Sequence, residues 1–162
     1  MNRPPRPSDE GVIQRPMLIR SWLFLGLIVA GLEMAGFFFV LGGAGWHPGA
    51  AIGAGHPLHH AYLQATTMSL VGMMAGQIGT AFAVRTRRES LRAIGVFSNR
   101  YLLLAIGGVV LLAAAFVYAP PLQGLLATTA LPLRDVLFLV PYPFIVWGAD
   151  ELRRWLIRRR RG

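Results

Sequence analysis

The chain has 162 residues, of which 54% are hydrophobic and 14% are charged. This composition is too apolar for an ordinary soluble domain and predicts a membrane protein. The net charge of +9 comes from 16 arginines and no lysine. The arginines lie between apolar runs, as topology-setting charges do, so we expect a lipid bilayer and no nucleic acid as partner. The absence of cysteine excludes disulfides and thiolate chemistry.

The first sixteen residues, MNRPPRPSDEGVIQRP, contain proline and arginine without apolar periodicity. We interpret residues 1–16 as a polar arm on the cytoplasmic side. The apolar run 17–41 that follows is long enough for a transmembrane helix and too long for a signal-peptide core.

Glu33 lies near the middle of this first apolar run. An acid inside a bilayer is costly unless it is protonated, paired or turned toward other helices, and it therefore marks a position of functional interest. Two interpretations stay open, a neutral Glu33 hydrogen-bonded to a neighbouring helix and a Glu33 that takes part in proton or cation movement.

Residues 42–57 read GGAGWHPGAAIGAGHP and predict a loop. His47, His56, His59 and His60 supply imidazoles, but no carboxylate or thiol stands nearby to complete a metal site. We therefore expect no metal ion here and no catalytic residue in the chain.

The next apolar segment, residues 62–84, carries no formal charge from Thr66 to Val84 and predicts a second crossing. Gln77 and Thr80 lie one turn apart in it, with further polar groups nearer its start. Gly72, Gly76 and Gly79 fall close to the same sector and would let another helix approach. The pattern predicts a helix buried among helices.

An arginine-rich loop (85–100), a third crossing (100–118) and a fourth (131–152) complete the chain. Pro120 and Pro121 should stop the third helix, and Pro141 and Pro143 should kink or unwind the fourth. Residues 156–162 form a basic tail. Because the arginines gather on alternate connections, we expect an all-α membrane protein, an antiparallel bundle of four transmembrane helices within residues 17–155, with both termini cytoplasmic.

Three stretches of this sequence carry a family resemblance. The opening MNRPPRP, the second apolar segment with Thr67-Met68, Gln77, Ala81-Phe82 and its arginine exit, and the Asp150-Glu151 ending resemble helices seven to ten of type II cation-transporting P-type ATPases. In those pumps the position matching Gln77 helps line the cation sites, and the position matching Thr80 is an acid in some members. The resemblance therefore implies Gln77 and Thr80 as candidate cation-binding residues.

The resemblance also implies a division of labour. The DKTG phosphorylation motif, the TGE loop and a nucleotide-binding domain do not occur in these 162 residues, so we expect no ATP hydrolysis by this chain alone and no cofactor in it. A cation and ATP-Mg would enter only in an assembly with the N-terminal part of such a pump. The chain then corresponds to the back part of a truncated or split pump, placed in the cell (plasma) membrane as a multi-pass protein.

Two other interpretations stay open. The chain could be a pump-derived four-helix module, alone or as a homo-oligomer, with a structural or partner-binding role and no transport. It could also be a small independent carrier that depends on Glu33. The sequence does not identify the cation.

Overall fold

The computed structural model describes residues 19–84 and 99–159, and these residues form helices joined by loops and turns, without strands. The predictions for residues 1–18, 85–98 and 160–162 lie outside this described part. In chain order the elements are η1 (Arg20–Leu25), α2 (Gly26–Gly43), α3 (His59–Val84), α5 (Arg100–Tyr118), α6 (Pro120–Leu126), α7 (Leu133–Leu139) and α8 (Tyr142–Arg159).

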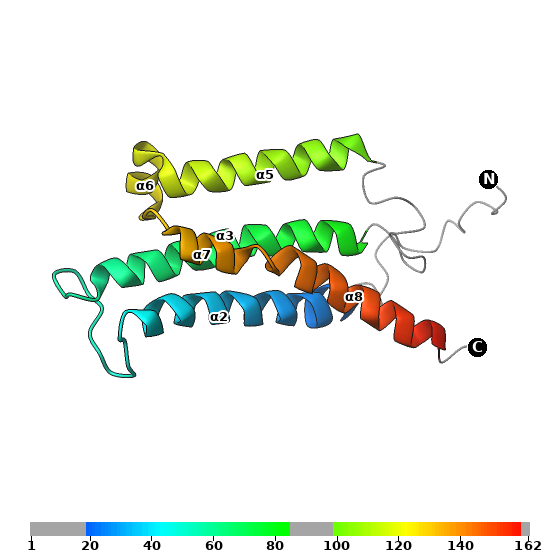
Figure 1. The fold of residues 1–162 in the computed structure, drawn as a ribbon, viewed down its shortest axis with the longest axis horizontal. Coiled ribbons are helices and arrows are strands. Elements are labelled where there is room, and N and C mark those ends of the chain that lie inside the picture. Colours follow the sequence, from blue (N-terminus) through cyan, green and yellow to red (C-terminus); the bar gives the residue numbers. More distant parts are fainter. Residues whose placement is uncertain (1–18, 85–98, 160–162) are drawn as a thin grey trace, which may run out of the picture.

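The first two long helices lie side by side and form the centre of the molecule (Figure 1). The π-helical stretch η1 leads directly into α2, and the expected first crossing thus continues to Gly43. α3 begins at His59, three residues before the start we expected, and ends at Val84. The buried residues of the main core cluster come from α2 and α3, from the last part of the chain (Leu131, Leu139 and Tyr142), and from Val117 near the end of α5.

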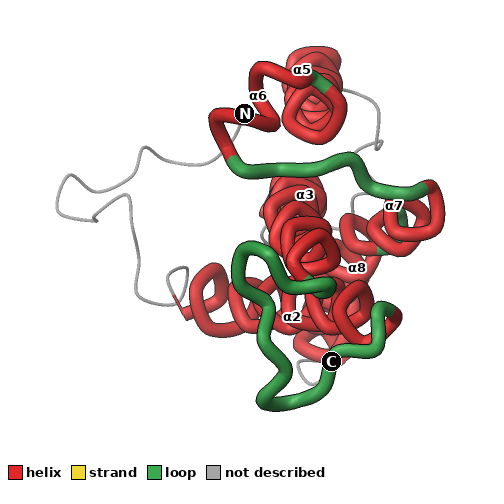
Figure 2. The backbone as a smooth tube through the Cα atoms, turned by 90° about the vertical axis from the view of Figure 1, so that its left-hand side faces the viewer, coloured by secondary structure: helices red, strands yellow, loops and turns green. Residues whose placement is uncertain are grey.

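The last part of the chain packs against the pair formed by α2 and α3 (Figure 2). Phe138 of α7 stacks on Phe39 of α2, with ring centroids 4.2 Å apart. The guanidinium carbon of Arg134 lies over the same Phe39 ring, 4.4 Å from its centroid. A second, smaller core cluster joins Leu25, Ala83 and Val146, all of which are buried. Both clusters therefore depend on the same three-way contact among α2, α3 and the α7–α8 segment.

α7 and α8 are separated by a turn at Val140 and Pro141. Pro141 and Pro143 have no amide hydrogen for helical bonds, so a continuous helix cannot pass this point. This finding agrees with the break that the two prolines predict. The helix resumes at Tyr142 and continues to Arg159, seven residues beyond the expected end of the fourth crossing.

Most of α5 stands apart from this core (Figure 1), which it reaches through Val117 near its end. Its start is capped by Asn99, whose side-chain oxygen accepts hydrogen bonds from the amides of Tyr101 and Leu102, both at 3.1 Å. Val117 is the buried residue of this helix, and large apolar side chains such as Leu104 and Leu111 are more than two-thirds exposed. The apolar surface of α5 is thus left for lipid or for another protein segment.

The connection after α5 contains a short helix. Pro120 ends α5 but opens the short helix α6, since proline fits the first turn of a helix. Residues 127–132, which we call the strap, then run from α6 to α7 beside the N-terminal part of α3 (Figure 2). The Thr129 amide donates to the buried Thr67 Oγ1 at 3.0 Å, and Gln64 Nε2 donates to the Ala130 carbonyl at 3.3 Å. The strap fastens the end of the α5–α6 segment to α3.

Three of the described helices are long and apolar enough to cross a membrane, namely Trp22–Gly43, His59–Val84 and Arg100–Tyr118. In the third of these, the observed bounds coincide with the expected 100–118. The segment expected as the fourth crossing, residues 131–152, falls in two helices, α7 and α8, and is not among these three. The chain is a helical membrane protein.

Candidate functional site

α3 presents a glycine face to the neighbouring helices. Gly72, Gly76 and Gly79 are all buried, as the sequence led us to expect of glycines that admit a close helix. A Cβ at Gly79 would lie 2.6 Å from the Pro143 carbonyl oxygen and 2.9 Å from the Pro143 Cα. The backbone of α8 therefore comes too close to Gly79 for any other residue.

The other two glycines of this face receive side chains. A Cβ at Gly76 would lie 2.9 Å from Val29 Cγ1 of α2, and one at Gly72 would lie 3.2 Å from the Tyr142 ring of α8. Gly76 is thus the contact with α2, whereas Gly72 and Gly79 are contacts with α8. Because α3 touches both helices through small residues, its position relative to them is closely defined.

Gln77 lies on a different side of α3 from this glycine face. Its side chain is exposed in the described part of the chain, and so is that of Met73, one turn earlier. The prediction that the polar residues and the glycines share one buried sector is therefore wrong for Gln77. Consecutive helix residues are about 100° apart, so Gln77 cannot follow Gly76 into the same contact. We call the side of α3 that carries Met73 and Gln77 the open flank.

Thr80 is half-buried at the edge of the open flank. Its hydroxyl donates to the Gly76 carbonyl of the preceding turn at 3.0 Å. Thr66 and Ser69 likewise donate to carbonyls of their own helix. These hydroxyls satisfy their donors locally, which leaves their oxygen lone pairs as acceptors.

Glu33 of α2 is half-buried. It lies directly after Leu32, whose carbonyl accepts the hydroxyl hydrogen of Tyr142 from the start of α8. Within residues 19–84 and 99–159, Glu33 itself has no hydrogen bond or ion pair. The hydrogen-bonded partner helix that we considered for Glu33 is thus not found in the described part of the chain.

Tyr142 is a structural residue that the sequence alone did not single out. It is buried, its hydroxyl binds α2, and its ring lies against Gly72 of α3, so it joins three helices at the proline break. A Cβ at Gly36 would lie 2.7 Å from its hydroxyl oxygen. The sequence feature that could have predicted this role is a tyrosine between two prolines inside an apolar run. A buried tyrosine hydroxyl usually requires a hydrogen-bond acceptor.

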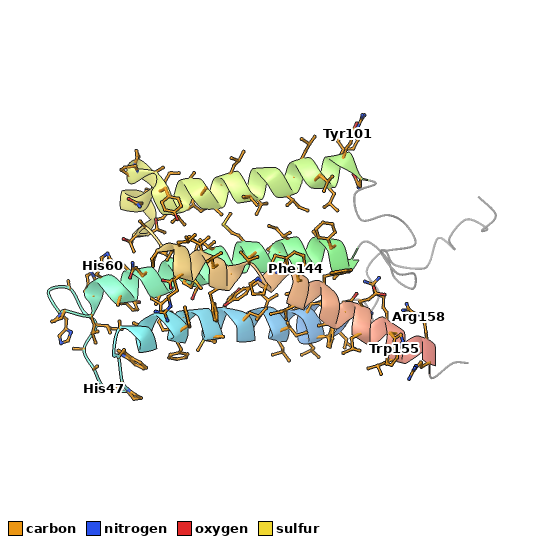
Figure 3. All side chains as sticks on the ribbon, in the orientation of Figure 1. His47, His60, Tyr101, Phe144, Trp155 and Arg158 are labelled. Atoms are coloured by element: carbon orange, nitrogen blue, oxygen red, sulfur yellow. The ribbon has the colours of Figure 1, made fainter. Side chains whose placement is uncertain are left out.

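The acid pair Asp150 and Glu151 forms ion pairs with arginines of α8. Asp150 is fully buried, accepts a hydrogen bond from Arg153 Nε at 3.1 Å and forms an ion pair with Arg154 Nη2 at 3.0 Å. Glu151 lies 3.4 Å from Arg154 and 3.5 Å from Arg158. Figure 3 places Trp155 and Arg158 at the end of the molecule where α5 begins with Tyr101, and His47 and His60 at the opposite end. The basic and histidine-containing segments thus occupy opposite ends of the helices.

Comparison with known proteins gives a consistent family. The profile of the family described as "Cation transporting ATPase, C-terminus" matches residues 1–156. The calcium-transporting ATPase 1 of Bacillus cereus is 30% identical over 151 residues, which cover 90% of this chain and 17% of that protein. The calcium-transporting ATPase 1 of Schizosaccharomyces pombe is 38% identical over 97 residues, which cover 60% of this chain and 11% of that protein.

A relative named for a different cation is also similar. The potassium-transporting ATPase alpha chain 1 of Xenopus laevis is 23% identical over an alignment of 183 residues. The alignment covers 99% of this chain and 18% of that protein. The chain thus spans less than a fifth of the length of these relatives. Its match to the family profile from residue 1 to residue 156, together with three apolar helices long enough to cross a membrane, identifies it as a member of the family of C-terminal membrane domains of cation-transporting P-type ATPases.

Proposed function

We propose that this chain works as the C-terminal membrane domain of a cation-transporting P-type ATPase, in which it supplies scaffold helices and part of the cation path. The phosphorylated aspartate and the nucleotide-binding domain belong, in this proposal, to the N-terminal part of the pump. The observation that carries the proposal is the exposure of Gln77 beside a glycine face that is already packed.

The two sides of α3 differ in whether the same chain covers them. The glycine face is covered by α2 and α8 of the same chain. The open flank leaves the Gln77 amide uncovered at the level of the apolar crossing, where neither lipid nor apolar side chains can satisfy it. A polar surface on further helices would satisfy this amide, and the N-terminal part of a pump would provide such helices.

The chemistry of the open flank suits a cation. The amide oxygen of Gln77 and the hydroxyl oxygen of Thr80 are neutral ligands of the kind that hard cations accept. The Thr80 hydroxyl hydrogen is already donated to the Gly76 carbonyl, so its lone pairs stay available. In this proposal Gln77 lines the cation path and Thr80 makes a lesser contribution.

The proposal includes a membrane topology. α2 begins, α3 ends, α5 begins and α8 ends on the same side of the molecule (Figure 1). With α7 and α8 together as a broken fourth crossing, the helices would form an antiparallel four-helix domain. The arginine-rich segments 1–16, 85–100 and 156–162 would then share the cytoplasmic side, in keeping with the positive-inside rule. The membrane we propose is the cell membrane.

A second function is favoured by α5. Only 6% of its most apolar stretch is buried, against 33% for α3. Such a surface would also suit a pump-derived module that assembles with itself or with a partner and transports nothing. Stable homo-oligomers without cation-dependent ATP hydrolysis would support this alternative.

The test is reassembly. The full chain is co-expressed with a tagged polypeptide that carries DKTG and the preceding helices of a related calcium pump, and the purified complex is assayed for Ca²⁺-stimulated ATP hydrolysis. We expect co-purification, stimulated hydrolysis, and a weaker response to Ca²⁺ with Gln77→Ala. Gly108→Ala, on a free side of α5, is the matched control and should behave as wild type. Failure to co-purify, or an unchanged Ca²⁺ response with Gln77→Ala, would contradict the proposal.

A further inference from the structure

Glu33 on α2 and Gln77 on α3 are polar side chains of the described crossings that have no hydrogen-bonding partner within the described residues. Glu33 is half-buried, and Gln77 is exposed. Neither has a hydrogen bond or an ion pair within residues 19–84 and 99–159. The contacts among α2, α3 and α8 decide whether the two side chains belong to one surface.

The position of Glu33 on α2 follows from its neighbours. Val29, one turn before it, contacts Gly76 of α3, and Phe37, one turn after it, has its ring centroid 6.3 Å from that of Tyr62 of α3. Residues one turn apart share a side of a helix, so Glu33 lies at the seam with α3. Gly36 of this helix meets both Tyr142 of α8 and Met68 of α3. Glu33 and Phe37 are rotated from Gly36 in the same direction, away from α8.

The position of Gln77 on α3 follows in the same way. Gly76 faces α2, and Gly79 faces α8. Gln77 is rotated by about 100° from Gly76, in the direction opposite to Gly79. It therefore also lies on the side away from α8, which is the side of Met73. Glu33 and the open flank of α3 thus belong to the same side of the α2–α3 pair.

The level of the two groups in the membrane is set by the contact of Val29 with Gly76. Because α2 and α3 run in opposite directions (Figure 1), Glu33 and Gln77 are displaced from this contact in opposite senses. Their separation along the helix axes is about 7.5 Å, from five residues at a rise of about 1.5 Å per residue. Both side chains are long enough to reach toward a single bound ion from this spacing.

We propose that Glu33 and Gln77 form one cation-binding surface on the α2–α3 pair, with Glu33 as the charged ligand and Gln77 as a neutral oxygen ligand. This inference rests on the proposed function and extends it, since it adds a carboxylate to a path for which only neutral ligands were otherwise available. A carboxylate beside an amide oxygen is a ligand combination that hard cations such as Ca²⁺ and K⁺ accept. Water completes the coordination when the chain is alone.

The charge balance around Glu33 agrees with this role. α3 contributes no acidic or basic residue between Ala61 and Val84. Among the packed elements, the Tyr142 hydroxyl of α8 lies within electrostatic range of Glu33 and donates to the Leu32 carbonyl. No arginine of α2, α3, α7 or α8 within the described residues forms an ion pair with Glu33. A bound cation would supply the missing positive charge.

The experiment measures cation binding directly and needs no ATP hydrolysis. The full chain is placed in nanodiscs of zwitterionic lipid, and equilibrium dialysis with radioactive Ca²⁺, and separately with radioactive Rb⁺ in place of K⁺, gives the binding isotherms. Glu33→Gln keeps the shape of the side chain and removes its charge. Glu151→Gln removes an acid that is already paired with arginines at the end of α8, and it serves as the matched control.

We expect saturable binding of at least one of the two cations by the wild-type chain. Glu33→Gln should weaken this binding about tenfold or more, Gln77→Leu about threefold, and Glu151→Gln not at all. Equal binding by the wild type and Glu33→Gln, or no saturable binding by the wild type, overturns the inference. Because the measurement uses the chain alone, its failure is distinct from a failure of reassembly with the N-terminal part of the pump.

Discussion

α3 and α5 look alike as apolar segments, yet they have different surroundings in the structure. Both are long enough to cross a membrane, but 33% of the most apolar stretch of α3 is buried and 6% of that of α5. Both contain glycines near their middle. A Cβ at Gly79 of α3 would collide with the backbone of α8, whereas nothing lies within 4 Å of a Cβ at Gly107 or Gly108 of α5.

This difference separates two properties of a membrane helix. Length and apolar composition decide that a segment can cross the bilayer. Packing inside the protein requires in addition small residues that face a neighbour and polar groups that find partners. α3 has both, through its glycine face and through the bond between Thr67 and the strap. α5 is attached through its end, and its length is left uncovered.

The strongest test of this comparison exchanges glycine for alanine in both helices. Gly79→Ala places a Cβ 2.6 Å from the Pro143 carbonyl and should lower the free energy of unfolding in mixed micelles by about 1–3 kcal/mol. Gly108→Ala has open space around its Cβ and should change this free energy by less than about 0.5 kcal/mol. Equal effects of the two changes would contradict the difference in packing.

Thr67→Val tests the attachment of the strap to α3. Thr67 is buried, accepts from the Thr129 amide at 3.0 Å and donates to the Leu63 carbonyl at 2.7 Å. Without the hydroxyl the Thr129 amide loses its acceptor, so the free energy of unfolding should fall by about 1–2 kcal/mol. Thr66→Val, which removes a hydroxyl that bonds only within its own helix, is the control and should cost less. Hydrogen exchange at the Thr129 amide should become faster in the first variant and stay unchanged in the second.

Much of the fold could be predicted from the sequence. The apolar runs predicted four crossings; three of them form helices long and apolar enough to cross a membrane, and the bounds of α5 agree with the predicted 100–118. Pro141 and Pro143 predicted the break in the fourth segment, because a proline cannot supply the amide that a helix needs. The glycines of α3 indicated a close helix contact, but not with which helix, since a periodic pattern gives a face and not its neighbour.

The remaining features depend on tertiary contacts. Gln77 was predicted to lie in the glycine sector, but the structure places it on the open flank, because Gly76 already faces α2. The short helix α6 was missed, since Pro120 ends one helix and also begins another. The bond from Tyr142 to the Leu32 carbonyl joins residues far apart in the chain, and no local pattern predicts such a pair.

Tyr142→Phe tests the packing of α8 against α2 and α3. The change removes the hydroxyl that binds the Leu32 carbonyl and keeps the ring that covers Gly72. We expect a loss of about 1 kcal/mol in the free energy of unfolding. Tyr101→Phe, at an exposed end of α5, should have no measurable effect, and a similar loss in both variants would show that Tyr142 is not special.

The proposed function requires that the N-terminal part of a pump covers the open flank of α3. The chain contains no cysteine, so Gln77→Cys and Leu111→Cys each give one site for a nitroxide spin label, on α3 and on α5. Electron paramagnetic resonance then reports label mobility and oxygen accessibility for the chain alone and for the reassembled complex. The account predicts that the label at position 77 becomes immobile and loses contact with lipid-dissolved oxygen on reassembly, with a smaller change at position 111. An unchanged spectrum at position 77 in a complex that has formed would contradict it.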